Sequence, residues 1–166
     1  MNVNIALLTV TDTRTFENDK SGAILVKKIE KEKHNLIDRR ICKDNKDDII
    51  KVLKIWINQK NVDVIITTGG TGLTGRDITP EAINEIADKH IPGFGEVFRT
   101  ISLKTVGTSA IQSRACAVLS NGKYIFALPG SSGGVTDAWD CILKYQLDIN
   151  NKPCNFVELL PRLKEK

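Results

Sequence analysis

Apolar and polar positions along this chain form two kinds of pattern that alternate with each other. Nearly continuous apolar runs at residues 2–10 and 62–66 predict strands covered on both faces. A run at 36–42 is interrupted by arginines and predicts a strand nearer the sheet edge. Helical periodicity starts near Ser21 and again near Asp47, so helices separate the three strands. This order predicts a mostly parallel sheet with helices on both faces.

Three further helices are predicted from start signals and spacing. Thr79 suits an N-cap and Pro80 a first helical position, so a helix should begin there and run to about His90. Another helix is expected after Gly95, and a third over residues 135–145.

A hairpin signal completes the predicted sheet. The apolar runs at 115–119 and 124–128 flank an Asn121-Gly122 pair, which is typical of a tight turn between antiparallel strands. We therefore predict an α/β fold: a three-layer sandwich with a mostly parallel central sheet, helices on both faces and one antiparallel edge hairpin. Residues 1–166 are expected to form a single domain.

Composition narrows the function classes. The chain is 41% hydrophobic and 27% charged with a net charge of +4, and its lysines are scattered among acids, so no basic stripe indicates a nucleic-acid partner. No apolar run is long enough for a membrane span and no targeting segment is visible, which predicts a cytoplasmic protein. The four cysteines lie far apart and are expected to be reduced. His34 and His90 are expected to be solvated.

The candidate chemistry gathers in one stretch, residues 62–83, which reads VDVIITTGGTGLTGRDITPEAI. A predicted strand ends there, a loop with four glycines follows, and a helix begins. Such a loop offers free N–H groups and close backbone approach to an anion such as phosphate. Asp77 follows the glycines, where a metal ion bridging phosphate oxygens needs a hard oxygen ligand. The stretch therefore predicts a nucleotide or phosphoester site.

These residues also fit other interpretations to different degrees. Residues 70–75 match G-x-G-x-x-G, but the helix is delayed and the strand is the third, which argues against a dinucleotide fingerprint. No Gly-Lys-Ser/Thr follows, which excludes a P-loop. Asp77 also fits a turn residue, and Asp44 or Asn45 fits a helix N-cap. A second Gly/Ser loop, LPGSSGG at 128–134, follows another strand and suits a second phosphate.

Several motifs resemble the MoaB/MogA family of molybdenum cofactor biosynthesis proteins. These are TTGGTG (67–72), RDITPEA (76–82), PGFGEVFR (92–99), SRA (113–115), LPGS (128–131) and, like B-type bacterial members, KPCNF (152–156). The resemblance implies an α/β domain that binds molybdopterin and assembles as a homo-oligomer, a trimer or a hexamer. Catalytic members use Mg-ATP to adenylylate molybdopterin. The alternative is a non-catalytic molybdopterin-binding oligomer that carries or protects the cofactor intermediate.

The resemblance also implies roles for individual residues. Asp77 and Asp44 are the expected catalytic acids and Mg²⁺ ligands, with ATP and molybdopterin as substrates. Contacts to these ligands are expected from the two glycine loops and their neighbours: Thr11, Asp12, Thr68, Gly69, Gly70, Thr71, Gly72, Thr79, Pro80, Glu81, Ser113, Arg114, Pro129, Gly130, Ser131 and Ser132.

Overall fold

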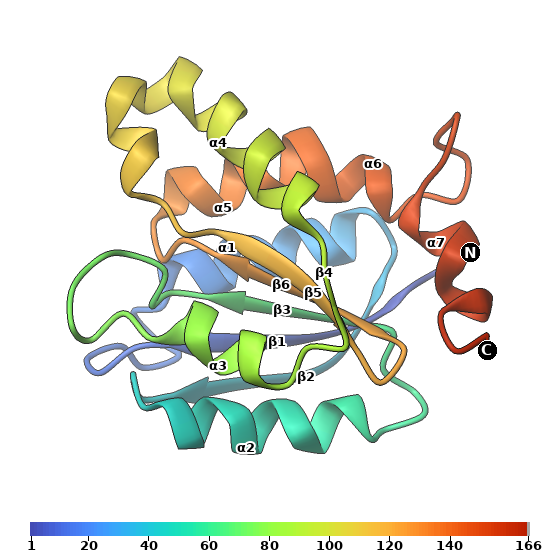
Figure 1. Cartoon of the computed structure of the whole chain (residues 1–166), viewed down its shortest axis with the longest axis horizontal. Helices are drawn as coiled ribbons and strands as arrows, with labels where there is room; N and C mark the ends of the chain where they lie inside the picture. Colours follow the sequence, from blue (N-terminus) through green and yellow to red (C-terminus); the bar gives the residue numbers. More distant parts are fainter. Residues whose placement is uncertain (166) are drawn as a thin grey trace.

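A six-stranded sheet forms the centre of the molecule in the computed structural model, which describes residues 1–165 (Figure 1). The last residue of the predicted 1–166 domain lies outside the described residues. The strand order is β2-β1-β3-β6-β5-β4. The strands are β1 (Asn4–Val10), β2 (Asn35–Cys42), β3 (Val64–Thr68), β4 (Lys89–His90), β5 (Cys116–Ser120) and β6 (Lys123–Leu128). β1, β2, β3 and β6 pair in parallel, whereas β5 pairs antiparallel with both β6 and β4.

Helices cover both faces of this sheet, as predicted (Figure 1). α2 and α3 pack on one face, and α1, α4 and α5 with the following turns pack on the other. The helical elements are α1 (Lys20–Lys31), α2 (Lys46–Ile57), α3 (Thr79–Glu85), α4 (Pro92–Val106), η1 (Gly107–Gln112), α5 (Ser132–Ala138), the π-helical turn η2 (Trp139–Leu143), α6 (Lys144–Gln146), α7 (Phe156–Leu159) and η3 (Leu160–Arg162).

The period-2 alternation of strand side chains explains why the central strands are apolar throughout. In β1, Ile5 and Leu7 pack among residues of α1 and α5, whereas Ala6 and Leu8 pack among residues of α2 and α3. Trp56 on α2 is fully buried in the second cluster. Both faces of each central strand are thus removed from water, which gives the three layers of the predicted sandwich.

The helix predicted to follow the glycine loop, from Thr79 to about His90, has both of its boundaries wrong. Thr79 is not the N-cap of α3; Ile78 holds that position, and the Thr79 hydroxyl instead donates to the Gly69 carbonyl at 2.9 Å. The helix ends at Glu85 rather than near His90, because Lys89–His90 form the short edge strand β4 against β5.

The structure also answers the expectations about the α2 cap, the starts of α4 and α5, the cysteines and membrane-spanning helices. Of the two candidate caps for α2, Asn45 accepts a hydrogen bond from the Asp48 N–H at 3.1 Å, which leaves Asp44 free of that role. α4 begins at Pro92, before Gly95, and α5 begins at Ser132. All four cysteines are free. No helix within residues 1–165 is long and apolar enough to cross a membrane.

His34 corrects another expectation, because it is half-buried rather than solvated. Its Nδ1 accepts a hydrogen bond from the Val3 N–H at 3.2 Å. Burial lowers the pKa of His34 below its usual value, so the neutral imidazole fits its place beside Val3 and the Trp139 ring. His90 is exposed, as predicted.

Candidate functional site

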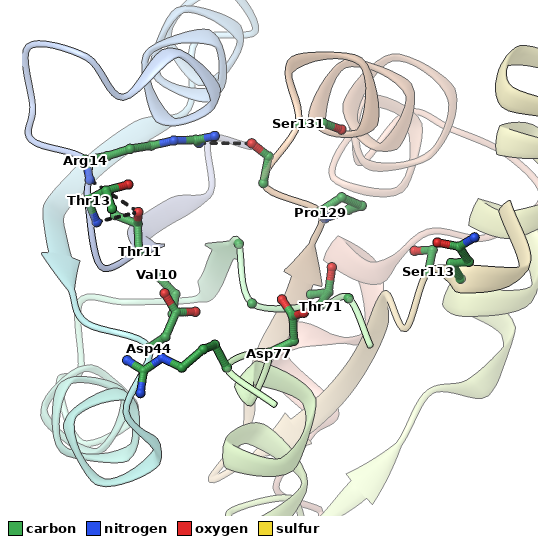
Figure 2. A pocket seen from close by; sticks show the side chains of 16 residues that line it. Val10, Thr11, Thr13, Arg14, Asp44, Thr71, Asp77, Ser113, Pro129 and Ser131 are labelled. Carbon is green, nitrogen blue, oxygen red and sulfur yellow. Dashed lines mark hydrogen bonds between the residues drawn. The ribbon is translucent and has the colours of Figure 1, made fainter. Parts of the chain in front are cut away.

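A pocket of about 500 Å³ opens at the carboxyl ends of β1, β3 and β6. Parallel strands place their carboxyl ends at one edge of the sheet, and the loops that leave them frame a crevice there. Residues from both sequence-predicted glycine loops line it, together with the segment after β1 (Figure 2). The lining residues are Val10, Thr11, Thr13, Arg14, Asp44, Gly69, Gly70, Thr71, Gly72, Arg76, Asp77, Gln112, Ser113, Pro129, Gly130 and Ser131.

Two glycines in the first loop allow the chain to turn at the end of β3. Gly69 and Gly70 have φ of +104° and +66°, in the left-handed region that side chains disfavour. A Cβ on Gly69 would lie 2.2 Å from the Val10 carbonyl oxygen, and one on Gly70 would lie 2.3 Å from the Thr79 hydroxyl. The close passage of this loop against β1 and α3 therefore requires glycine at both positions.

Arg114 braces the same loop from outside the pocket. Its Nε donates to the Gly72 carbonyl at 2.7 Å and its Nη2 to the Asp77 carbonyl at 2.8 Å, while Nη1 pairs with Glu81. The backbone N–H of Arg114 also donates to the Thr71 carbonyl at 3.0 Å. Arg114, expected from sequence to contact the ligand directly, is thus occupied in holding the loop that carries Asp77.

The Asp77 side chain lines the pocket and also accepts hydrogen bonds from its own loop. Its Oδ2 accepts hydrogen bonds from the Thr74 N–H at 2.8 Å and from the Thr74 hydroxyl at 2.7 Å. Burial raises the pKa of Asp77, but the hydrogen bonds from Thr74, a further one from the Gly72 backbone and the positive charge of Arg114 together outweigh it and leave that pKa below its usual value. The carboxylate is therefore ionised at neutral pH and held in a defined orientation.

Asp44 reaches the pocket from the segment between β2 and α2. Its backbone N–H donates to Oδ1 of Asp12 at 3.2 Å. Burial, and then the charges of Asp12 and Asp77, raise the pKa of the Asp44 carboxyl. The carboxylates of Asp12 and Asp77 are thus close enough to Asp44 to raise its pKa, and Asp44 and Asp77 both line the pocket. Within residues 1–165, no three His, Cys, Asp or Glu side chains converge as a protein-only metal cage.

The second glycine loop lies across the pocket from these acids, as Figure 2 shows for Ser131. Arg14 reaches over to this loop: its Nη1 donates to the Gly130 carbonyl at 2.9 Å and to the Ser21 hydroxyl at 3.0 Å. The Ser131 hydroxyl oxygen accepts from the Gly134 N–H at 3.1 Å and caps α5. The Thr68 hydroxyl donates to the Pro129 carbonyl at 2.8 Å, which links the two loops.

The structure gathers most of the sequence-predicted site residues into this pocket. Both candidate metal ligands line it, as do nine of the expected ligand contacts: Thr11, Gly69, Gly70, Thr71, Gly72, Ser113, Pro129, Gly130 and Ser131. The remaining seven do not line it and support its walls or flank them: Asp12, Thr68, Thr79, Pro80, Glu81, Arg114 and Ser132. Direct ligand contact by any of these residues stays a prediction.

The resemblance suggested pterin contacts from the TDTR segment (11–14), but the site residues named from the sequence did not include Arg14 and Arg76, the two cationic side chains that line the pocket, or Val10, Thr13 and Gln112. The sequence positions of both arginines could have indicated that they lie at the pocket. Arg14 closes the polar TDTR segment after the first strand, and Arg76 directly precedes Asp77 in the glycine stretch. Each position follows a strand whose carboxyl end was already expected at the ligand-binding edge.

Comparison with known proteins places the chain in a family. Residues 6–148 match the family described as "Probable molybdopterin binding domain", and the chain belongs to it. It is 43% identical over 152 residues to "Molybdenum cofactor biosynthesis protein B" of Escherichia coli K12, covering 92% of this chain and 89% of that one.

Solved structures of the MoaB/MogA type agree with this assignment. A crystal structure of "Molybdenum cofactor biosynthesis protein B" superposes with a TM-score of 0.89 at 36% identity, covering 100% of this chain and 98% of that one. The "tungsten cofactor synthesizing protein MoaB from Pyrococcus furiosus" gives 0.77 at 34% identity, covering 86% and 91%. The resemblance inferred from the sequence motifs is therefore confirmed, and so is the predicted fold.

Proposed function

We propose that this protein is a molybdopterin adenylyltransferase in molybdenum cofactor biosynthesis. It binds molybdopterin and Mg-ATP, transfers AMP to the terminal phosphate of the pterin, and releases pyrophosphate. Membership of the family and the names of its relatives support the pathway and the pterin ligand. The pocket supports the reaction.

One observation carries the proposal: two carboxylates and two glycine loops face the same pocket. Asp44 and Asp77 come from segments 33 positions apart in sequence, yet both line it together with residues of the loops at 69–75 and 130–134. A site for a pterin alone needs one phosphate cradle. Two phosphate-binding loops with paired acids suit two phosphate-bearing ligands brought together.

The acids fit Mg²⁺ in chemistry and in charge. Both are hard oxygen donors, and Mg²⁺ in nucleotide sites takes one or two carboxylates and completes its shell with phosphate oxygens and water. The raised pKa of Asp44, caused by burial and by the charges of Asp12 and Asp77, marks a place where negative charge accumulates. A bound Mg²⁺ would neutralise charge on the phosphates, and Asp44 and Asp77 would hold it.

The protein's own part in such a reaction is to position the two ligands. An oxygen of the terminal pterin phosphate attacks the α-phosphorus of ATP; a new P–O bond forms, the bond to the bridging α,β-oxygen breaks, and pyrophosphate leaves with that electron pair. The attacking phosphate is already ionised, so no general base is required. The loops supply N–H donors, and Arg14 adds positive charge beside the second loop.

The proposal also includes the oligomeric state of the protein and its cellular compartment. We expect a homo-oligomer, a trimer or a hexamer, in the cytoplasm, with no nucleic-acid or membrane partner. Size-exclusion chromatography with light scattering gives the number of subunits.

The test is direct. Purified protein is mixed with molybdopterin, ATP and Mg²⁺, and the products are separated by chromatography. Adenylylated molybdopterin and an equal amount of pyrophosphate support the proposal. Tight molybdopterin binding with neither product supports the alternative, a non-catalytic oligomer that carries or protects the intermediate. Omitting Mg²⁺ is the matched control and should abolish product formation.

A further inference from the structure

Arg76 and Asp12 form an ion pair at the edge of the proposed nucleotide site. Nε and Nη2 of Arg76 donate to the same Asp12 oxygen, Oδ2, at 3.0 and 2.6 Å. The other oxygen, Oδ1, accepts from the Asp44 N–H. Arg76 lines the pocket and directly precedes Asp77 in the chain. Asp12 thus holds a cationic side chain next to both candidate metal ligands.

We propose that Arg76 exchanges partners when the nucleotide binds: it leaves Asp12 and donates to a phosphate group of ATP. This inference rests on the proposed function, because it assigns a substrate-binding role to a residue of that same site. Asp12, expected from sequence to contact the ligand, instead becomes the residue that holds Arg76 before ATP binds.

The exposure of the pair makes the exchange feasible. The Arg76 side chain is 66% exposed and that of Asp12 is 37% exposed. Water and salt weaken ion pairs of this kind, so the bond to Asp12 costs little to break. A phosphate group offers more negative charge and several acceptor oxygens, which match the forked donors of a guanidinium.

The other nearby arginines are committed to the protein backbone. Arg14 holds the Gly130 carbonyl, and Arg114 holds the carbonyls of Gly72 and Asp77. Moving either one would leave carbonyl groups of the loops without these donors. Arg76 has only a side-chain carboxylate as its described partner, so it is the pocket arginine that can turn to a ligand without disturbing a loop.

The exchange predicts opposite effects for its two partners. In Asp12→Asn, the side-chain oxygen still accepts from the Asp44 N–H, but the charge that competes for Arg76 is gone, so ATP should bind more tightly. In Arg76→Gln, the phosphate loses its partner, so ATP should bind more weakly. A merely structural ion pair predicts the same loss for both variants.

The experiment is a double-mutant cycle of ATP binding, measured by calorimetry with and without Mg²⁺. We expect Asp12→Asn to tighten binding about threefold or more, and Arg76→Gln to weaken it about tenfold, the scale of charge-assisted contacts. The increase in ATP affinity caused by Asp12→Asn should be smaller in the presence of Arg76→Gln, because the guanidinium that Asp12 otherwise holds is then absent. Asp140→Asn, which removes an exposed partner of Lys28, is the matched control for loss of one negative charge and should leave binding unchanged.

The outcomes separate this inference from the proposed function. If wild-type protein binds ATP but Asp12→Asn gives the same gain with and without Arg76, or Arg76→Gln has no effect, the exchange is wrong and the adenylyltransferase proposal stands. If wild-type protein binds no ATP in either condition, both fail together. Thermal unfolding of each variant shows whether a lost affinity reflects a lost fold.

Discussion

Replacing Asp77 by asparagine tests the proposed chemistry with little disturbance of the loop. In the structure, Oδ2 of Asp77 accepts two hydrogen bonds from Thr74. The asparagine side-chain oxygen can accept both, so the loop should keep its shape while the site loses one negative charge. Because that charge is proposed to hold Mg²⁺, turnover should fall by about two to three orders of magnitude, equivalent to about 2.7–4 kcal/mol of transition-state stabilisation.

Asp77→Ala is the matched variant that separates charge from loop structure. It removes the charge and also both acceptor contacts to Thr74. Its free energy of unfolding should therefore fall by about 1–2 kcal/mol, whereas that of Asp77→Asn should stay close to the wild-type value.

The assay combines three measurements on each variant: AMP transfer at saturating substrates, molybdopterin affinity by fluorescence, and unfolding in urea. Asp77→Asn should lose turnover while it keeps pterin affinity and stability. Unchanged turnover in Asp77→Asn would remove this carboxylate from the mechanism. A large loss of stability in Asp77→Asn would show that its charge, rather than its hydrogen-bond geometry, maintains the loop.

Three further predictions concern the structure around the site. Arg114→Met removes the three side-chain contacts of Arg114, to the Gly72 and Asp77 carbonyls and to Glu81. It should lower the free energy of unfolding by about 2–3 kcal/mol, measured in urea. Gly69→Ala combines a positive φ with a 2.2 Å contact to a carbonyl oxygen and should cost at least about 2 kcal/mol in the same assay. The pKa of His34 is lowered in the folded protein, first because of burial, so just below about pH 6.5 the unfolded state binds more protons than the folded state. The free energy of unfolding should therefore rise as the pH increases toward that value. His34→Asn should flatten this slope.

Each of these predictions has a control and a contradicting result. Glu81→Gln keeps a side-chain acceptor for Arg114 and should lower the free energy of unfolding less than Arg114→Met does. An equal loss in both variants would show that Arg114 stabilises the loop through its ion pair with Glu81 alone. A Cβ on Gly75 would have no neighbour within 4 Å, and the φ of Gly75 lies outside the left-handed region, so Gly75→Ala should be tolerated. His90→Gln alters an exposed histidine and should keep the pH slope, and a slope that survives His34→Asn would locate its cause elsewhere.

Much of the fold was predictable because burial leaves a clear pattern in this sequence. The central strands β1, β3 and β6 are covered on both faces, so they read as apolar runs with turn signals at their ends. The two arginines within 36–42 correctly indicated an edge strand. The two-residue strand β4 carries no such pattern, because both of its residues are exposed and only its pairing with β5 defines it.

The site was predictable in its loops and less so in its side chains. Glycines and Asp77 follow strand ends, and the strand order brings those ends together. What a side chain does within the pocket depends on long-range contacts that spacing does not encode. Arg114 reaches the carbonyls of Gly72 and Asp77 across about forty positions of sequence, and Thr79 turns back to Gly69 instead of capping its own helix.

The most direct test of the proposed function follows a radioactive label from ATP. Purified protein is incubated with molybdopterin, Mg²⁺ and ATP labelled on either the α- or the γ-phosphate. We predict that the α-label appears in the pterin fraction and the γ-label in pyrophosphate. Label from the γ-phosphate in the pterin would indicate phosphorylation instead, and bound molybdopterin that acquires no label from either ATP would contradict the assignment of an adenylyltransferase.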